Sequence, residues 1–448
     1  MRDRGALIAS LDRTVPEAIR ESGVPGVAIA VVDGETEIIR CVGVADAERG
    51  DPVDVDTLFQ CGSVTKTLTA TLLQQLLEEG RLDLDAPVRT YLPELRLADE
   101  SVARAVTPRH LLAHVAGFEG DVFIDTGAGD DALARYVAAL ADTPQVAPFD
   151  WTHAYCNAGY AILGRIVEVL RGRPFDAAAR EHVLEPLGMK RTGFAWETAT
   201  HAASGHVVID GAARVVRPWR LFRSFASGGA LVSTARELLA YARLHLGRRE
   251  PVLSAGAVER MREPLYAPQK SPAAMAWTVA AVGGVRILTH GGSTVSHTAH
   301  LAVVPDRDVA FAVLTNADRG APVVRAVSRA VLQGHLGLPA PAPAEWRAVP
   351  RERAAEYAGR YRAAIYEVTV GSDADGVWLE AVRRGGMDAH QRPRPEPLPR
   401  MRLDFSDDDR AVVRNGPFAE MPVWFARDRN GSVRWVRFFG RLTPRRDP

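Results

Sequence analysis

The stretch Ser63-Val64-Thr65-Lys66 comes directly before a strongly apolar run, Leu68 to Leu77. This combination is the strongest indication of the fold in the chain. The leucines of that run recur at helical spacing, which predicts a long buried helix ended by Gly80. Residues three apart lie on one helix face, so the Ser63 hydroxyl and the Lys66 amine come within hydrogen-bond reach. A hydroxyl beside a basic amine has the geometry of an activated nucleophile. The positive end of the helix dipole also favours an anionic oxygen there.

The lysine in this stretch is unusual for the chain, whose only lysines are Lys66, Lys190 and Lys270 among 55 basic residues. Arginine stays protonated in proteins, whereas a desolvated lysine can lose its proton and act as a base. This choice favours a proton-transfer role for Lys66. Taken alone, the motif is weak, because an N-capping serine followed by an ordinary solvated lysine is the more common explanation of such spacing.

Composition excludes several classes of function. Basic and acidic residues both number 55, which argues against a nucleic-acid or anionic-membrane partner, and the basic tail formed by Arg441, Arg445 and Arg446 is too short to change this. The amino-terminal segment lacks the apolar core of a signal peptide, and Val24 to Val32 is too short to span a bilayer. Three cysteines without metal-ligand spacing indicate reduced thiols. We therefore expect a cytoplasmic protein.

The order of segments predicts an α+β fold. Residues 26–44 form two strands joined as a hairpin around Gly34, and strands return at 276–292 and 300–316, followed by a helix from Val323 to Leu336. Between them, residues 85–270 are helical with Gly- and Pro-rich turns. Strands at both ends of this region predict one sheet built from its two termini, with a helical insertion covering it.

We predict a domain of residues 1–337, a stiff Pro/Ala linker at 338–345 and a second domain at 346–448. The last region consists of short alternating segments with hairpin turns, typical of a small antiparallel barrel or sandwich. Its tryptophans, Trp378, Trp424 and Trp435, either cover the pocket of the first domain or fill the barrel, and we favour the barrel interior.

Two further motifs follow the serine. Tyr155-Cys156-Asn157 opens a helix and can aim a phenol, an acid/base group, and an amide at one point. His290-Gly291-Gly292 ends a strand, and its glycines allow a substrate backbone to approach closely. Singly, Tyr155 and His290 are also explained as buried structural residues.

Together, the order S-x-x-K, Y-x-N and H-x-G across residues 63–292 resembles the serine β-lactamase and penicillin-binding-protein superfamily, particularly its class C β-lactamase, esterase and D-peptidase branch. The segments RLDLDAPVRTYLPEL, TPRHLLAHVAGF, EPLGM and GGALVSTARELLAY follow in family-like order, and the resemblance spans roughly residues 10–335. It implies a β-lactamase-like antiparallel sheet with a helical insertion.

The resemblance also implies roles. Ser63 becomes the acylated nucleophile, Lys66 accepts its proton, and Tyr155 relays a proton to the leaving and attacking groups. Asn157 holds Lys66 and the substrate amide. The backbone N–H groups of Ser63 and Ser293 form an oxyanion hole beside Gly291 and Gly292. His290 stands where many members have the lysine of K-T-G, which makes any positive charge there pH-dependent and puts β-lactam carboxylate recognition in doubt.

The missing signal peptide favours an acyl donor inside the cell. The chain is similar in length and layout to the stand-alone penicillin-binding-protein-type thioesterases that cyclise surugamide-like nonribosomal peptides and carry a lipocalin-like C-terminal domain. By that resemblance it is a head-to-tail macrocyclase whose partner is a peptidyl thioester on a peptidyl carrier protein. The alternatives are a cytoplasmic D-stereospecific peptidase or esterase, then a β-lactamase, and finally a non-catalytic binding protein.

No metal or organic cofactor is expected. His110 and His114 have the i, i+4 spacing of zinc ligands, but no HExxH pattern accompanies them, so we interpret both as structural.

Overall fold

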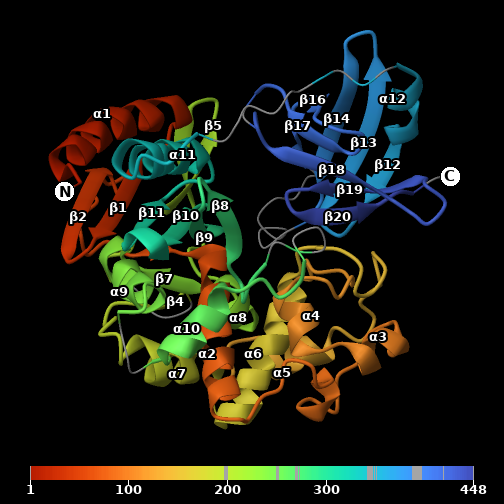
Figure 1. Cartoon of the computed structure of the whole chain (residues 1–448), viewed down its shortest axis with the longest axis horizontal. Helices are drawn as coiled ribbons and strands as arrows, with labels where there is room; N and C mark the ends of the chain where they lie inside the picture. The colour runs from red at the N-terminus through yellow and green to blue at the C-terminus, as the bar shows by residue number, and fades with distance from the viewer. Residues whose placement is uncertain are drawn as a thin grey trace.

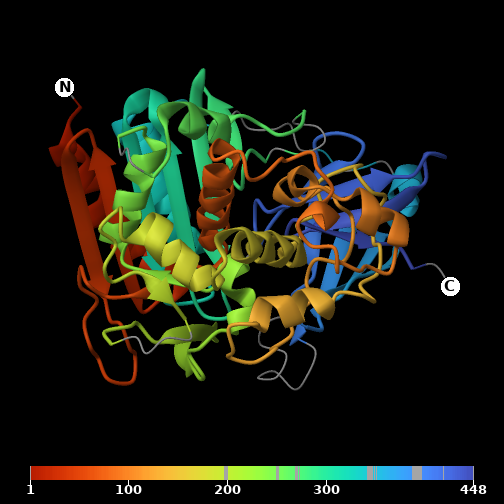
Figure 2. The ribbon, with the colours of Figure 1, turned by 90° about the horizontal axis from the view of Figure 1, so that it is seen from below.

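The computed structural model describes residues 2–195, 200–248, 252–267, 271, 273–340, 347, 349, 351–385, 396–416 and 418–446. Figures 1 and 2 show a sheet flanked by helices, a mostly helical region beside it, and a second unit at the C-terminal end that consists mainly of β-strands. This arrangement confirms the α+β prediction. No helix among the described residues is both long enough and apolar enough to cross a membrane.

A six-stranded antiparallel sheet is built from both ends of the first region, as predicted, in the order β2-β1-β11-β10-β9-β8. Its strands are β1 (Gly26–Asp33), β2 (Thr36–Gly43), β8 (Thr278–Val282), β9 (Val285–Ser293), β10 (Thr298–Val304) and β11 (Val309–Thr315). The hairpin between β1 and β2 turns at Gly34, whose φ of 63° is one that glycine adopts without strain.

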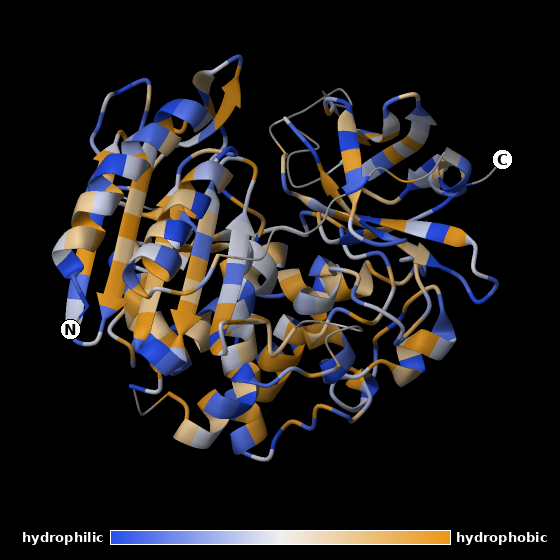
Figure 3. Cartoon of the chain, turned by 45° about the horizontal axis from the view of Figure 1, so that its top comes forward, coloured by the Kyte–Doolittle hydropathy of each residue, from blue (hydrophilic) through white to orange (hydrophobic). Residues whose placement is uncertain are grey.

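Strand β1 is apolar on both faces because both faces of the sheet are covered. Val27, Ile29 and Val31 belong to a core with α1 (Arg4–Ser22) and α11 (Ala321–Arg329). Ala28, Ala30 and Val32 point into the larger core shared with the helical region. Successive side chains of a strand alternate between faces, so every residue of β1 is buried. Figure 3 shows this concentration of hydrophobic residues in the sheet.

The helical region surrounds α2, the helix predicted after Ser63. This helix runs from Thr65 to Glu78, is buried along most of its length, and is followed by Gly80 at φ 67°. A one-turn 3-10 helix, η1 (Gly62–Val64), precedes it. The other helices of this region are α3 (Glu100–Ala105), α4 (Pro108–Leu112), α5 (Ala132–Ala138), α6 (Asn157–Arg171), α7 (Phe175–Ala179), α8 (Ala226–Gly229), α9 (Ala235–His245) and α10 (Ala255–Arg262).

Small sheets complete the first unit. Strands β3 (Phe59–Gln60), β7 (Leu231–Ser233) and β4 (Gly193–Phe194) pair beside η1, and β5 (Gly205–Ile209) pairs with β6 (Ala212–Val216). The pairing of β3 with β7 places the segment that leads into Ser63 against the residues that follow α8.

The C-terminal unit is a nearly closed antiparallel barrel, which confirms the predicted small all-β fold. Its strands follow the order β12-β13-β14-β16-β17-β18-β19-β20, and a bridge between Tyr361 and Arg445 brings the first strand back to the last. The helix α12 (Arg351–Tyr357) packs on its interior. The strands are β12 (Gly359–Arg362), β13 (Tyr366–Asp373), β14 (Gly376–Arg383), β15 (Glu396–Pro397), β16 (Met401–Phe405), β17 (Arg410–Val413), β18 (Pro422–Arg427), β19 (Val433–Phe438) and β20 (Arg441–Pro444).

The tryptophans do not fill this barrel, so the sequence interpretation was wrong on that point. The barrel core consists of Val, Leu, Ala, Met, Phe and Tyr side chains and contains none of the three. Trp378 lies between the buried Val377 and Leu379, and alternation therefore turns it outward, against the guanidinium of Arg400. Trp435 faces the first unit and packs on Trp151.

The barrel lies directly on the helical region. Trp435 donates its indole N–H to the Val146 carbonyl at 2.8 Å, and the Ala364 N–H donates to the Glu119 carboxylate at 2.8 Å. Residues 341–346 of the predicted linker lie outside the described residues, so the exact division at 337 and 346 stays a prediction.

Candidate active site

Ser63 lies in η1 and Lys66 in the first turn of α2, so the predicted pair forms. The Lys66 Nζ lies 3.2 Å from the Ser63 Oγ. The turn is made possible by Gly62, at φ 50°, because a Cβ there would lie 2.6 Å from the backbone nitrogen of Ser293. Glycine thus lets η1 approach the end of β9.

Lys66 is fully buried, and its amine has two strong hydrogen-bond acceptors. Nζ donates to the Asn157 Oδ1 at 2.7 Å and to the Gly228 carbonyl at 2.6 Å. A neutral amine has two N–H bonds and one lone pair, so these two acceptors leave the lone pair to face the Ser63 hydroxyl. Burial lowers the pKa of Lys66 well below its usual range, and the nearby Arg441 guanidinium lowers it further. Lys66 is therefore suited to accept the Ser63 proton.

Tyr155 lies beside this pair, with its ring centroid 5.0 Å from the Lys66 Nζ. Burial raises the pKa of Tyr155 to about 12, although a hydrogen bond with Ser63 acts in the opposite direction. The phenol therefore stays protonated at neutral pH and can donate a proton near the serine oxygen. Its own backbone N–H donates to the Gly440 carbonyl of the barrel at 3.1 Å.

Asn157, at the first position of α6, connects Lys66 to a buried carboxylate. Its Nδ2 donates to the Asp121 Oδ1 at 2.6 Å while its Oδ1 accepts from Lys66. Asp121 also accepts from the Arg441 Nε at 2.9 Å, and its side chain has no exposed surface. Burial alone would lower the pKa of Arg441, but the Asp121 charge holds it above the usual value. A polar chain thus runs from the barrel through Asp121 and Asn157 to the catalytic amine.

His290 is a buried residue near the C-terminal end of β9, and its ring is neutral. Its Nδ1 donates to the Gly291 carbonyl, since a carbonyl only accepts, and the two atoms are 2.7 Å apart. Burial lowers the pKa of His290 to about 3, with a further contribution from Lys66. The positive charge left open by the sequence is therefore absent at neutral pH.

The two glycines after His290 serve different purposes. A Cβ on Gly292 would lie 1.9 Å from the Cys61 carbonyl and 3.2 Å from the Ser63 nitrogen, so Gly292 permits close packing of β9 on η1. A Cβ on Gly291 would meet nothing within 4 Å, and this residue faces open space. The backbone nitrogens of Ser63 and Ser293 come to the same edge of the cleft by this packing. Of the two, Gly291 is the one that leaves room for a substrate.

Ser63, Tyr155 and His290 open onto a cleft of about 550 Å³ that both units help to form, whereas Lys66 and Asn157 are not among its lining residues. The barrel contributes Phe439 and Arg441, while β9, β10 and α11 provide the opposite side. Its lining includes Ser63, His114, His153, Tyr155, His290, Gly291, Gly292, Ser293, His300, Val324, Arg325, Phe439 and Arg441.

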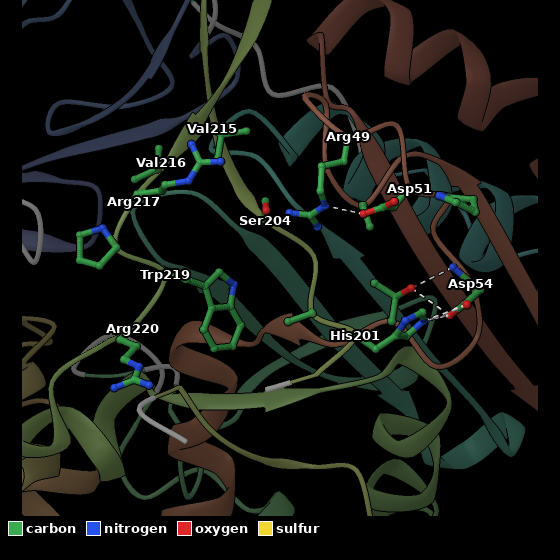
Figure 4. Close-up of a pocket in the computed structure, with 15 residues that line it drawn as sticks. Arg49, Asp51, Asp54, His201, Ser204, Val215, Val216, Arg217, Trp219 and Arg220 are labelled. Carbon is green, nitrogen blue, oxygen red and sulfur yellow. Dashed lines mark hydrogen bonds and ion pairs between the residues drawn. The ribbon is translucent and has the colours of Figure 1, made fainter. Parts of the chain in front are cut away.

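A larger cavity of about 930 Å³ lies elsewhere, between the loop after β2 and the segment after β6 (Figure 4). Two ion pairs lie among its lining residues, Arg49 with Asp51 and His201 with Asp54. None of the predicted catalytic residues lines it. The smaller cleft is therefore the candidate active site.

His110 and His114 do not share a ligand. His110 caps α4 through Thr107 and lies 3.3 Å from the Asp150 carboxylate, in agreement with a structural interpretation. His114 points instead toward Tyr155, with ring centroids 4.4 Å apart.

The comparisons with known proteins agree with this geometry. Residues 11–336, well over half of the chain, match the family described as Beta-lactamase. The chain belongs to the beta-lactamase family. Members of this serine hydrolase family act through an acyl-enzyme, and the position of Ser63 beside Lys66 fits that chemistry.

Individual beta-lactamase-family relatives differ in how much of the chain they cover. Penicillin-binding protein 4 of Amycolatopsis lactamdurans is 40% identical over 319 residues, which span 67% of this chain and 83% of that protein. Esterase EstB of Burkholderia gladioli is 38% identical over 211 residues, 43% of this chain and 53% of the esterase. Among solved structures, SurE is 28% identical, with a TM-score of 0.75, over 98% of this chain and 100% of its own. The match to SurE therefore includes the barrel.

Three members of this beta-lactamase-type site, Asp121, Gly228 and Arg441, escape the sequence interpretation. Gly228 belongs to the family-like segment GGALVSTARELLAY, where a carbonyl leaves no signal in the residue type. Arg441 was assigned to a basic tail, whereas the structure places it over the Tyr155 ring, 5.0 Å from its centroid.

Proposed function

We propose that this protein is a serine acyltransferase that releases a peptidyl thioester by head-to-tail cyclisation. The observation that carries the proposal is the match to SurE over nearly the whole of both chains, barrel included. A second SurE structure, determined with D-Leu, matches 99% of this chain at 27% identity and a TM-score of 0.75. We therefore assign a donor peptide that ends in a D-residue. The donor is carried on a peptidyl carrier protein, which places the reaction in the cytoplasm.

In the acylation step, the neutral Lys66 amine takes the Ser63 proton as Oγ attacks the thioester carbonyl. The N–H groups of Ser63 and Ser293 stabilise the oxyanion. The carbon–sulfur bond then breaks, and the departing thiolate receives a proton through Tyr155. The peptide is left as an ester on Ser63.

In the second step, the N-terminal amine of the same peptide attacks that ester. The proton that the amine loses passes through Tyr155 to the neutral Lys66 amine, and Lys66 returns it to the Ser63 oxygen as that oxygen leaves. Asn157 holds the Lys66 amine in place, and its own amide N–H donates to Asp121. The product is a ring closed by a new amide bond, and the free enzyme is restored.

Barrel residues make ring closure more favourable than hydrolysis in this scheme. Phe439 and Arg441 cover one side of the cleft and reduce the access of water to the ester. A tethered amine also reacts at a high effective concentration compared with a second molecule.

A D-stereospecific peptidase or esterase is the second candidate, favoured by the similarity to esterase EstB. In that reaction water replaces the peptide amine, and the same residues act in the same order. A β-lactamase is less compatible with the site, because the neutral His290 supplies no fixed positive charge for a β-lactam carboxylate.

The test uses a synthetic peptidyl N-acetylcysteamine thioester with a D-residue at its C-terminus. We expect the wild-type chain to yield the cyclic peptide, which is lighter than the linear acid by one water, and Ser63→Ala to yield neither product above background. A matched donor with an acetylated N-terminus should give only the linear acid. Linear acid alone from the free-amine donor would refute the cyclase and leave the hydrolase.

A further inference from the structure

The backbone around Tyr155 is held by three consecutive hydrogen bonds. The Ala154 N–H donates to the His114 carbonyl at 2.8 Å, and the Tyr155 N–H donates to the Gly440 carbonyl at 3.1 Å. The Cys156 N–H donates to the Nδ1 of the His114 side chain at 3.0 Å. His114 therefore binds both neighbours of Tyr155, one through its backbone and one through its ring.

The His114 side chain is held in this position by burial, by its backbone conformation and by stacking on Tyr155. It is only 3% exposed, and its backbone has a φ of 57°, which a residue other than glycine adopts uncommonly. Its ring stacks on the Tyr155 ring at a centroid distance of 4.4 Å and an interplanar angle of 29°. Because Nδ1 accepts from Cys156, a neutral ring carries its proton on Nε2. Burial lowers the pKa of His114 well below its usual value, so the ring stays neutral.

We propose that His114 is the positioning residue of Tyr155 in acyl transfer, acting through the hydrogen bond that its Nδ1 accepts from Cys156. The proposal rests on the role of Tyr155 in the proposed function, but it holds for hydrolysis as well as for cyclisation. The Tyr155 hydroxyl must stay within reach of the Ser63 oxygen while the proton moves. A small displacement of the 154–156 segment moves the phenol away from it, and misplacement by about 1 Å can lower a rate about 100-fold.

Two substitutions separate the acceptor from the ring. His114→Asn keeps an acceptor oxygen close to the position of Nδ1, and asparagine tolerates the positive φ. His114→Phe keeps a flat ring against Tyr155 but accepts no hydrogen bond. Should the phenylalanine variant fail to fold, His114→Gly takes its place, because glycine adopts this φ without strain and removes both features.

The readout is steady-state hydrolysis of a p-nitrophenyl ester, with thermal unfolding by circular dichroism to confirm folding. We expect His114→Phe to lower kcat by about 10- to 100-fold, since proton transfer is misaligned. We expect His114→Asn to restore kcat to within about fivefold of wild type, because the acceptor is retained. A merely structural role would not give this rescue at equal stability.

His245→Phe is the matched control. His245 is also a fully buried histidine that lies between two aromatic rings, those of Tyr241 and Trp277, but it does not line the cleft. We expect its kcat to stay at the wild-type value. A phenylalanine or glycine variant of His114 with wild-type kcat overturns the proposal, as does an asparagine variant as slow as the phenylalanine one. A wild type that hydrolyses the ester but closes no ring refutes the cyclase alone.

Discussion

At the scale of single residues, the protonation state of Lys66 governs the site. Its two acceptors, Asn157 and Gly228, satisfy a neutral amine and leave its lone pair toward Ser63. Full burial favours that neutral form. Arginine at this position would stay charged and could not accept the serine proton.

Lys66→Arg and Lys66→Met should both reduce acylation of Ser63 by at least about 1,000-fold, because the nucleophile loses its general base. Acylation by a fluorophosphonate, followed by intact-protein mass spectrometry, measures this directly. Lys190→Arg is the matched control, since it replaces an exposed lysine outside the cleft. Undiminished turnover in the Lys66 variants would remove the basis of the mechanism.

The pH profile of acylation should have its acidic limb set by Lys66. Its lowered pKa means that activity is present above that pKa and is lost as the pH falls through it. His290 titrates at about 3 and should contribute no inflection near its usual value of about 6.5. In the His290→Asn variant, the acidic limb of the pH profile should therefore stay at the same pH, even if the maximal rate of acylation falls. A limb that disappears in this variant would assign the titration to His290 instead.

Sequence reasoning predicted the residues whose partners are close along the chain or belong to a family motif. Ser63 and Lys66 follow from helical spacing, and Tyr155 and Asn157 from their order after them. Asp121 and Arg441 are 320 positions apart and meet only because the barrel lies on the helical region. No local pattern encodes such a contact.

At the scale of elements, η1 approaches the end of β9 closely, where the proposed oxyanion hole lies. Gly62 and Gly292 leave no room for a side chain between these two segments. Gly291, one residue earlier on the same strand, faces open space. Alanine substitutions at Gly291 and Gly292 can therefore be compared as a matched pair, one without a steric clash and one with it.

Gly292→Ala should lower the melting temperature by several degrees, since its Cβ would overlap the Cys61 carbonyl and force backbone to shift. Gly291→Ala should leave the melting temperature within about one degree of wild type, because surface-type changes without a clash alter stability little. Differential scanning calorimetry on both variants provides the comparison. Equal melting temperatures would show that the strand relaxes around the added methyl group.

Element types were predictable where periodicity is strong. The apolar run of β1 and the helical spacing of α2 both appear at the expected places. The tryptophans were misassigned because large apolar residues were expected inside the barrel, whereas alternation along β14 and β19 already placed Trp378 and Trp435 outside. The alternation of buried and exposed positions was visible in the sequence, but the hydrophobicity of tryptophan was given more weight than this alternation.

At the scale of the whole molecule, the barrel belongs to the active site. Gly440 holds the Tyr155 backbone, and Arg441 pairs with Asp121, which in turn binds Asn157. Both charges act on Lys66, since Arg441 lowers its pKa and Asp121 raises it. The position of the barrel therefore affects the catalytic base directly.

Arg441→Met should move the acidic limb of the pH profile to higher pH, and Asp121→Asn should move it to lower pH, because they remove opposite influences on Lys66. Arg441→Met should also destabilise the fold by about 3–5 kcal/mol, since it leaves a buried carboxylate unpaired. The double variant should recover most of this loss, which urea unfolding measures as a coupling free energy. If the acidic limbs of both single variants moved in the same direction, Arg441 and Asp121 would not have opposite effects on the pKa of Lys66.

The complete burial of the Asp121 carboxylate determines how the enzyme should respond to ionic strength. Dissolved ions screen exposed charges within about 10 Å at 0.1 M salt, but they reach a dry carboxylate poorly. Turnover of a small neutral ester should therefore change less than about twofold between 0.05 and 1 M sodium chloride, a range that screens surface pairs strongly. A steep decline in turnover would mean that salt weakens the contacts between the barrel and the first unit. A flat response would show that the buried Asp121–Arg441 contact between the two units persists in concentrated electrolytes.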